Sequence, residues 1–301
     1  MGDGSKIEWT DATWNAIRGC SAVSAGCANC YAERDAGRWS GPGMPYEGLV
    51  KLTRNGAKWT GVVRLIEKHL HDPLRWTRPR LVFTNSMSDM FHESLPVTDI
   101  ASMFAVMALA PQHTFQILTK RAKVMHEVLA DPAFHALVAQ LAHDIAFSEP
   151  WAKRGIWKGP GSLAWPLKNV WLGVSVESQA CADERIPLLL RTPAALRWLS
   201  CEPLLEAVDL AKAPAISNAG YLNVDWIVVG GESGPAARPF HLEWASKIVA
   251  DAATAAVPVF MKQVGADPFL GGTAHKITDM KGKHPEDWPR NLQVRSFPEA
   301  S

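Results

Sequence analysis

The chain has 301 residues, of which 47% are apolar and 20% are charged, and its formal net charge is +1. This composition is typical of an ordinary globular protein, and it excludes a disordered or globally basic chain. Its apolar runs are shorter than the roughly 18 residues that a membrane-spanning helix needs. The first residues contain no apolar stretch of the kind found in secretory signals. The sequence therefore predicts a cytoplasmic protein with no membrane partner.

In chain order, a short strand is expected near Thr13–Ile17, followed by a cysteine-containing loop and a basic insertion over residues 35–79. From residue 80 onward, short apolar runs alternate with amphipathic stretches. The runs cover residues 80–86, 113–119, 169–175, 196–201, 225–231 and 258–263, and the amphipathic stretches cover residues 97–110, 123–129, 179–190 and 242–256. Continuous apolar runs are typical of parallel strands covered on both faces, and alternation with helices predicts βα units. We therefore predict an α/β fold, a partial (β/α)6-type parallel barrel, in a single domain spanning residues 1–301.

Two segments depart from this alternation. Residues 144–168 hold three tryptophans, Trp151, Trp157 and Trp165, among glycines and prolines, which predicts a long ordered loop. Residues 265–301 show no clear period and are expected to form an irregular extension that packs across the barrel.

Polar residues follow each of the six apolar runs. In parallel α/β architectures the active site lies at the carboxyl ends of the strands. From these positions we predict catalytic roles for Lys120, Glu177, Glu202 and Lys262, and cofactor contacts for Asn85, Ser86, Asp89, Ser175, Gly230, Gly231 and Glu232. The alternative is that the positions are polar because strands lead into loops there.

Three of the five cysteines, Cys20, Cys27 and Cys30, lie within eleven residues and have the spacing C-x6-C-x2-C. A disulfide framework would need many cysteines in a short secreted chain, so the cluster favours a metal site. Thiolates are soft ligands that suit iron–sulfur clusters, zinc and copper(I). Gly19 and Gly26 each precede a cysteine and allow the backbone to wrap closely around a metal.

Zinc is the first alternative for this cysteine cluster. Structural zinc needs four protein ligands. No fourth cysteine lies nearby and no histidine precedes His69, so a carboxylate such as Asp11 or Glu33 would have to complete a zinc site. Three thiolates without a fourth ligand favour a four-iron cluster with one open iron. Three unligated cysteines are the remaining alternative.

The segment from Asn15 to Glu33 resembles the cysteine loop of radical S-adenosylmethionine (SAM) enzymes, in which the usual spacing is C-x3-C-x2-C and an aromatic residue stands beside the last cysteine, as Tyr31 does here. More narrowly, the whole chain resembles a phage and bacterial three-cysteine family. The shared segments are Ile7–Asn15, Asn85–Phe91, Leu118–Arg121, Trp171–Glu177, Cys201–Leu204 and Val229–Gly234.

This resemblance implies that Cys20, Cys27 and Cys30 hold a [4Fe-4S] cluster and that SAM binds its open iron. Reduction by an electron donor such as flavodoxin or ferredoxin would then cleave SAM to a 5′-deoxyadenosyl radical. The stretch Gly230–Glu232 resembles the Gly-Gly-Glu motif that binds the SAM amino group. Here the motif follows a late strand instead of the second, and six residues separate the first two cysteines instead of three.

Residues 51–80 contain eight basic residues and two acidic residues, a local net charge of +6, with Trp59 and Trp76 among them. Cations with aromatic rings suit a nucleic-acid surface, although a solvated surface with core tryptophans gives the same pattern. Together with the radical chemistry that the resemblance implies, this segment leads us to predict a radical enzyme acting on a nucleotide, a nucleic acid or a related small molecule. Two alternatives remain: a nucleic-acid-binding protein with a structural metal, and a metal-dependent hydrolase or lyase using Glu177, Glu202 and Glu232.

Overall fold

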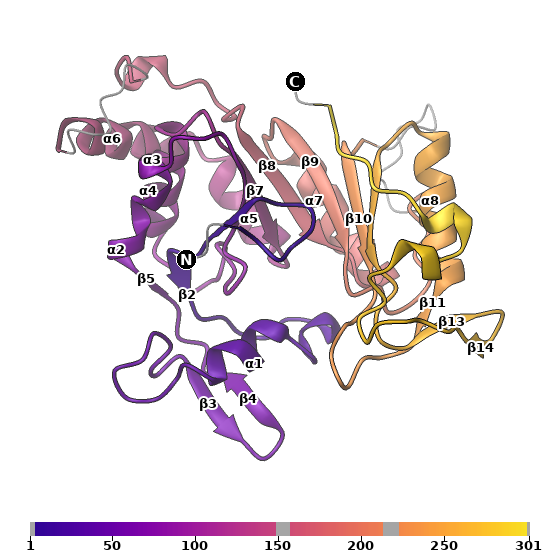
Figure 1. Cartoon of the computed structure of the whole chain (residues 1–301). Helices are drawn as coiled ribbons and strands as arrows, with labels where there is room; N and C mark the ends of the chain where they lie inside the picture. The colour runs from indigo at the N-terminus through magenta and orange to yellow at the C-terminus, as the bar shows by residue number, and fades with distance from the viewer. Residues whose placement is uncertain (1–3, 149–156, 213–222, 300–301) are drawn as a thin grey trace. The chain divides into compact units, whose positions relative to one another are not determined.

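The computed structural model describes residues 4–148, 157–212 and 223–299 (Figure 1). Its contacts divide the chain into two compact units, each built from separate stretches of sequence. The first unit consists of Met1–Ala22, Tyr31–Leu172 and Thr192–Leu196. The second consists of Val23–Cys30, Gly173–Arg191 and Arg197–Ser301.

A parallel sheet of seven strands is the main feature of the fold. Its strands, in spatial order, are β1 (Ala12–Trp14), β6 (Leu81–Thr84), β7 (Thr114–Thr119), β8 (Val170–Ser175), β9 (Leu196–Cys201), β10 (Trp226–Gly230) and β12 (Val259–Gln263). The resolved pairings β1–β6, β6–β7, β9–β10 and β10–β12 are parallel. All seven predicted strands are present, six of them within two residues of their predicted bounds, whereas β1 ends three residues earlier than predicted. Strands β1 and β12 are the outermost strands of the sheet. The predicted α/β class with an incomplete parallel barrel sheet is thus confirmed at this level.

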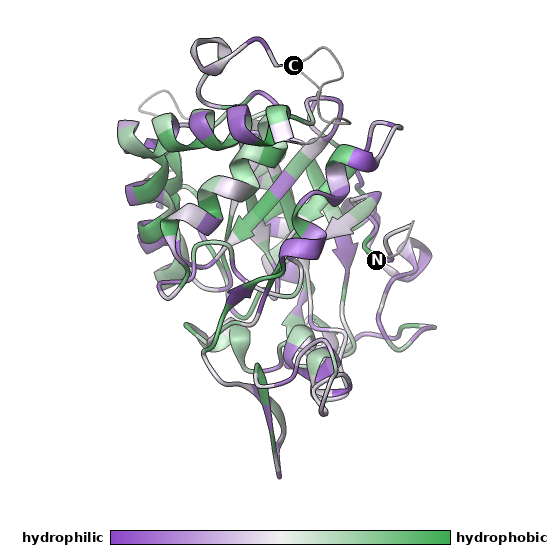
Figure 2. Cartoon of the chain, turned by 90° about the vertical axis from the view of Figure 1, so that its left-hand side faces the viewer, coloured by the Kyte–Doolittle hydropathy of each residue, from purple (hydrophilic) through white to green (hydrophobic). Residues whose placement is uncertain are grey.

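The first unit holds the helices α1 (Tyr31–Gly37), α2 (Glu67–Leu70), α3 (Asp72–Arg75), α4 (Val97–Ala108), α5 (Ala122–Leu129) and α6 (Pro132–Ser148), the 3-10 turn Pro160–Ser162, the hairpin of β3 (Val50–Thr53) and β4 (Gly56–Trp59), and the pair β2 (Ile17–Arg18) and β5 (Arg64–Leu65). Helix α4 is buried along much of its length and packs against α6 through Phe104 and Phe134, whose rings are 5.6 Å apart. Figure 2 shows hydrophobic colouring along much of the central strand in view, whereas the helices carry both hydrophobic and hydrophilic residues.

The predicted loop over residues 144–168 needs a correction, because α6 continues to Ser148. The helix starts where the Asp131 carboxylate accepts a hydrogen bond from the backbone N–H of Ala133 at 2.8 Å, as a helix N-cap does. Within the loop, Trp165 packs between Phe134 and His135, with its ring 4.2 Å from the imidazole. Trp151 lies outside the described residues.

The second unit holds α7 (Gln179–Arg191), α8 (Leu242–Thr254), the 3-10 turns Ala25–Cys27, Pro285–Asp287 and Arg290–Leu292, and a small sheet of β11 (Phe240–His241), β13 (Pro268–Leu270) and β14 (Thr273–Ala274). The predicted irregular extension over residues 265–301 needs a correction, because it contains β13 and β14. After β14 the described chain is irregular apart from the two 3-10 turns, and its end runs beside β12. There the Met261 N–H donates to the Val294 carbonyl, and the Ser296 N–H donates to the Val259 carbonyl, both at 2.9 Å. None of the helices in the described segments is long and apolar enough to cross a membrane.

Candidate functional site

In the first unit, the loop that leads to Cys20 is fastened to the turn that follows β6. The Asn15 side-chain oxygen accepts hydrogen bonds from the Ser86 hydroxyl and the Met87 N–H, both at 3.1 Å. The Ser88 hydroxyl donates to the Ile17 carbonyl at 2.9 Å. The turn at the carboxyl end of β6 therefore positions the backbone segment that directly precedes Cys20.

Gly19, directly before Cys20, has the left-handed backbone angle φ of +93°. A side chain there would also overlap the Val62 carbonyl oxygen. Glycine is required at this position for both reasons.

The Arg121 guanidinium lies beside Cys20 and is almost fully buried, with 3% of its side chain exposed. It donates to the Asp89 carboxylate at 3.2 Å, to the Glu93 carboxylate at 2.8 Å and to the Ser21 hydroxyl at 2.8 Å. Its Nη1 also lies 3.8 Å from the Cys20 sulfur. A cation beside a sulfur favours the thiolate, the form of cysteine that binds metals.

Burial opposes the charge of Arg121, but the charge of Asp89, the hydrogen bond to Glu93 and the interaction with Cys20 outweigh it and raise the pKa of Arg121. His92 contacts the same group, because its Nε2 lies 2.8 Å from the Ser21 oxygen. Its Nδ1 accepts from the Ser94 N–H, so the neutral ring donates from Nε2. Burial and the nearby Arg121 lower the pKa of His92, which keeps the ring neutral.

Asp89, a predicted cofactor contact, joins the ends of β6 and β7. It accepts from the Thr119 hydroxyl at 2.7 Å and from the N–H groups of Phe91 and Lys120 at 3.0 and 3.1 Å, in addition to Arg121. With four protein donors, Asp89 has the geometry of a residue that positions its neighbours. Lys120 is half-buried beside it.

Two more predicted contacts follow β6. The Ser86 carbonyl accepts from the Tyr31 hydroxyl at 2.7 Å. The Asn85 side chain is 4% exposed, its φ is +63°, and neither of its amide atoms is hydrogen-bonded to the described residues. Asparagine tolerates this backbone region better than most residues.

In the second unit, the turn that carries Cys27 rests on Glu177. The Glu177 side chain is 1% exposed and accepts from the Ser24 hydroxyl and from Arg185, whose Nη1 lies 2.7 Å away. The same Arg185 nitrogen donates to the Ser175 carbonyl at 2.9 Å. A Cβ on Gly26 would lie 2.7 Å from the Glu177 carboxylate, so only glycine allows this close approach.

Glu232 holds the other end of the same turn. Its carboxylate accepts from the Asn29 amide at 2.9 Å and from the backbone and guanidinium of Arg238. Arg238 also donates to the Ala25 carbonyl at 2.9 Å. Burial raises the pKa of Glu232, but the hydrogen bonds from Arg238 and Asn29 outweigh it, so the pKa is lowered and the carboxylate is ionised.

The last predicted residues lie at the ends of β9, β10 and β12. Glu202 and Lys262 form an ion pair at 3.0 Å. Gly230 and Gly231 are buried, and a Cβ on Gly230 would lie 2.7 Å from the Glu202 carboxylate. Cys201, predicted to be a small buried residue, is fully buried, and burial raises the pKa of its thiol.

The predicted metal ligands divide between the units, with Cys20 in the first and Cys27 and Cys30 in the second. All three are partly exposed. Among the described residues, no group of three or more histidine, cysteine, aspartate or glutamate side chains is gathered closely enough to hold a metal ion. The donors match an iron–sulfur cluster in chemical type, but the structure does not show them assembled.

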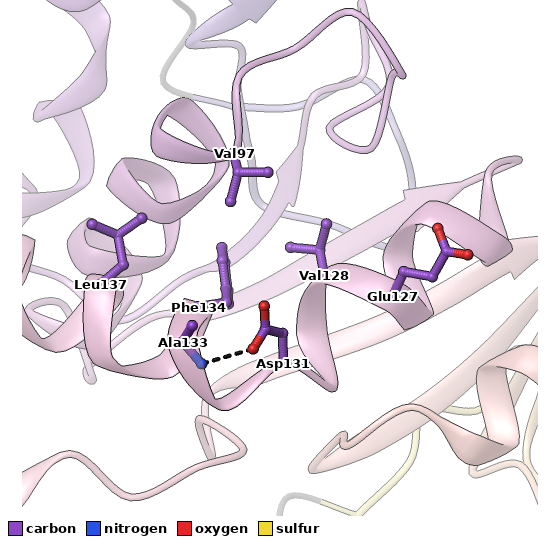
Figure 3. Close-up of a pocket in the computed structure, with 7 residues that line it drawn as sticks. All are labelled: Val97, Glu127, Val128, Asp131, Ala133, Phe134 and Leu137. Carbon is purple, nitrogen blue, oxygen red and sulfur yellow. Dashed lines mark hydrogen bonds between the residues drawn. The ribbon is translucent and has the colours of Figure 1, made fainter.

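A pocket of about 280 Å³ lies in the first unit among α4, α5 and α6 (Figure 3). Its lining is apolar except for Glu127 and Asp131, and Asp131 is engaged as the cap of α6. None of the site residues predicted from the sequence lines this pocket, so the pocket does not bear on the proposed role of the cysteines.

The structure thus gathers the predicted residues into two groups, one per unit. Cys20, Asn85, Ser86, Asp89 and Lys120 belong to the first unit, and Cys27, Cys30, Ser175, Glu177, Glu202, Gly230, Gly231, Glu232 and Lys262 belong to the second. Prediction from the sequence missed the partners that hold them: Ser21, His92 and Glu93 in the first unit, and Ser24, Asn29, Arg185 and Arg238 in the second. Arg121 was visible at the end of its strand, but its contact with Cys20 was not.

The fold and these two groups define an α/β protein with an open parallel sheet and a cysteine segment held by ion-paired carboxylates. Residues 4–289 match the model of the family described as "Protein of unknown function (DUF5131)", and the chain belongs to that family. No curated protein and no solved structure matches the chain.

Proposed function

We propose that this protein is a radical SAM-type iron–sulfur enzyme that binds a [4Fe-4S] cluster through Cys20, Cys27 and Cys30. The observation that carries the proposal is that all three cysteines are partly exposed, while the backbone bearing them is fastened by hydrogen bonds and by a buried ion pair. A bound cluster supplies the single electron that cleaves SAM reductively. Its substrate is a nucleotide, a nucleic acid or a related small molecule, and a flavodoxin or ferredoxin is the expected electron donor.

The carboxylates considered as a fourth zinc ligand support this choice, because both are engaged elsewhere. Glu33 is bound by the Lys58 ammonium at 2.8 Å and by the Trp59 N–H at 3.1 Å. Asp11 accepts from the Leu81 N–H at 2.8 Å. A site with three thiolates and no protein fourth ligand suits a cluster with an open iron better than structural zinc.

The chain's own residues have definable roles in this proposal. Arg121 offers the Cys20 sulfur an N–H donor and a positive charge. Glu177 positions the turn that bears Cys27 through its hydrogen bond with Ser24. Glu232 positions the same turn through Asn29 and Arg238. Both glutamates are therefore positioning residues.

Anaerobic purification followed by iron, sulfide and zinc analysis tests the cluster. We expect a brown protein with about four iron and four sulfide ions per chain. Cys27→Ala should lose both, whereas Cys181→Ala, which changes a partly exposed cysteine in α7, should retain them. A colourless protein that contains zinc would overturn the proposal.

The SAM step is tested separately, by reducing the iron-loaded protein with dithionite in the presence of SAM. Release of 5′-deoxyadenosine that is abolished in Cys27→Ala is the expected result. A protein with full iron and sulfide that releases none would contradict the SAM chemistry while leaving the cluster in place.

A further inference from the structure

Positive charge is concentrated in one stretch of the first unit. Residues 51–80 carry a net charge of +6, whereas the whole chain carries +1, so the remaining residues sum to −5. Three of the eight basic residues in this stretch, Lys51, Arg54 and Lys58, belong to the β3–β4 hairpin, and a local excess of positive charge attracts polyanions.

The hairpin of β3 and β4 opens this stretch. Its six consecutive residues 51–56 are all exposed, so neither face of its outer half is covered by the rest of the unit (Figure 1). Leu52 is 72% exposed, which is unfavourable for a large apolar side chain in water. The outer half of the hairpin is therefore a projecting two-stranded ribbon.

The base of the hairpin is firmly attached. Val50 and Trp59 face each other in the ladder, and both are buried. The Trp59 ring packs 6.4 Å from the Tyr46 ring, and the Trp59 backbone N–H donates to the Glu33 carboxylate at 3.1 Å. The projecting part therefore stands on a fixed base.

The charges of the ribbon are not balanced within it. Lys51 lies directly opposite Lys58 in the ladder, an arrangement of like charges that is destabilising. Lys58 is compensated by Glu33 at 2.8 Å. Lys51 and Arg54 are exposed and make no ion pair with the described residues. These two cations are available to an anionic partner.

We propose that the β3–β4 hairpin binds double-stranded DNA by entering its major groove. That groove is about 12 Å wide and admits a two-stranded β-ribbon. Lys51 and Arg54 would contact phosphates, and Arg54 and Asn55 at the tip have the donors that pair with guanine and adenine edges. The exposed Leu52 offers an apolar contact for a thymine methyl group.

The same geometry disfavours duplex RNA, because the major groove of an A-form helix is too narrow for side chains to read. The inference deepens the proposed function by naming duplex DNA among its possible substrates. DNA binding by the hairpin requires neither the cluster nor SAM. Loss of DNA binding would therefore contradict only the role of the hairpin, and absence of the cluster would contradict only the proposed enzyme function.

The test is fluorescence anisotropy of a labelled 25-base-pair DNA duplex with the full-length chain at 50, 100 and 200 mM KCl. The wild type should bind, with an affinity that falls steeply as salt rises. The double variant Lys51→Gln/Arg54→Gln should bind more weakly and lower the slope of log K against log salt by about 2. Circular dichroism and thermal melting would verify that the variant is folded.

The matched control is Lys281→Gln/Arg290→Gln, which removes the same charge from two exposed residues of the second unit. It should leave the slope unchanged. Equal loss in both double variants would show a response to net charge and overturn the assignment to the hairpin. Absence of duplex binding at 50 mM salt would overturn it as well, and so would equal or tighter binding of an RNA duplex or a single strand.

Discussion

At the scale of single residues, the ion pair of Arg185 and Glu177 is the most deeply buried in the candidate site, with 4% and 1% of the two side chains exposed. Replacing Arg185 with Met keeps much of the volume but leaves the Glu177 carboxylate buried without its cation. We expect a loss of about 3–5 kcal/mol in the free energy of unfolding, measured by urea denaturation.

The double variant Arg185→Met/Glu177→Gln separates the charge effect from packing. Because the second change removes the unpaired charge, it should recover part of the stability lost in Arg185→Met. If the double variant is as unstable as Arg185→Met, the destabilisation comes from lost packing and not from the buried charge.

His113 gives the first unit a pH-dependent stability. Its ring is fully buried, its Nε2 donates to the Pro73 carbonyl at 3.1 Å, and its Nδ1 is not hydrogen-bonded to any described residue. Burial lowers the pKa of His113. The unfolded chain therefore takes up a proton near pH 6.5 while the folded chain does not, and stability falls as the pH drops below that value.

This residue should contribute up to about 1.4 kcal/mol of lost stability per pH unit below pH 6.5. The measurement is urea denaturation at pH 7.5, 6.5 and 5.5, for the wild type and for His113→Gln, which retains a donor for Pro73. His113→Gln should show a smaller decrease than the wild type. An unchanged pH dependence in His113→Gln would contradict the argument.

Single residues also show how far the candidate site was predictable. The carboxylates Glu177, Glu202 and Glu232 could be located because each follows an apolar strand. Their partners could not, because Arg185 lies on the buried face of α7, where a charged side chain is not expected, and Arg238 lies in an irregular loop. The contact between Arg121 and Cys20 joins residues about a hundred positions apart, which no local pattern encodes.

At the scale of elements, the parallel strands were predictable because covering both faces of a sheet demands continuous apolar runs. Helix α6 was less so, since alanines on several of its faces blur the 3.6-residue period. The β3–β4 hairpin escaped prediction because its outer residues are exposed on both faces, so the strand alternation that normally marks a hairpin is missing.

The contact between Gly173 of β8 and Trp198 of β9 predicts how a change in one strand affects the stability of the protein. Gly173 in β8 lies against the indole ring of Trp198 in β9, and a Cβ on Gly173 would overlap that ring. Gly173→Ala should therefore destabilise the protein by about 1–3 kcal/mol through overpacking. Gly161→Ala, where a Cβ would meet no atom within 4 Å, should change the free energy of unfolding by less than about 0.5 kcal/mol.

Urea denaturation of the two glycine variants checks this prediction. The indole of Trp198 is fully buried, so it has little room to move away from a new methyl group. Equal stability of the two variants would mean that the ring shifts without cost and that β8 and β9 do not depend on the glycine.

At the scale of the whole molecule, the division of contacts into two compact units predicts unfolding in more than one step. Each unit has its own buried core, with Phe104 and Phe134 in the first and Trp198 and Trp226 in the second. Differential scanning calorimetry should then give a calorimetric enthalpy larger than the van't Hoff enthalpy, because a chain that unfolds in parts does not melt as one cooperative unit.

Two variants, one in each unit, would show which unfolding transition belongs to which unit. Gly173→Ala should lower the midpoint of one transition, and Phe104→Ala, which costs about 3–5 kcal/mol in a buried core, should lower the midpoint of the other. Strand β8 works against this separation, because it begins in the first unit and ends in the second. If the two units unfold together, both variants will shift a single transition and the two enthalpies will agree, which would contradict stepwise unfolding.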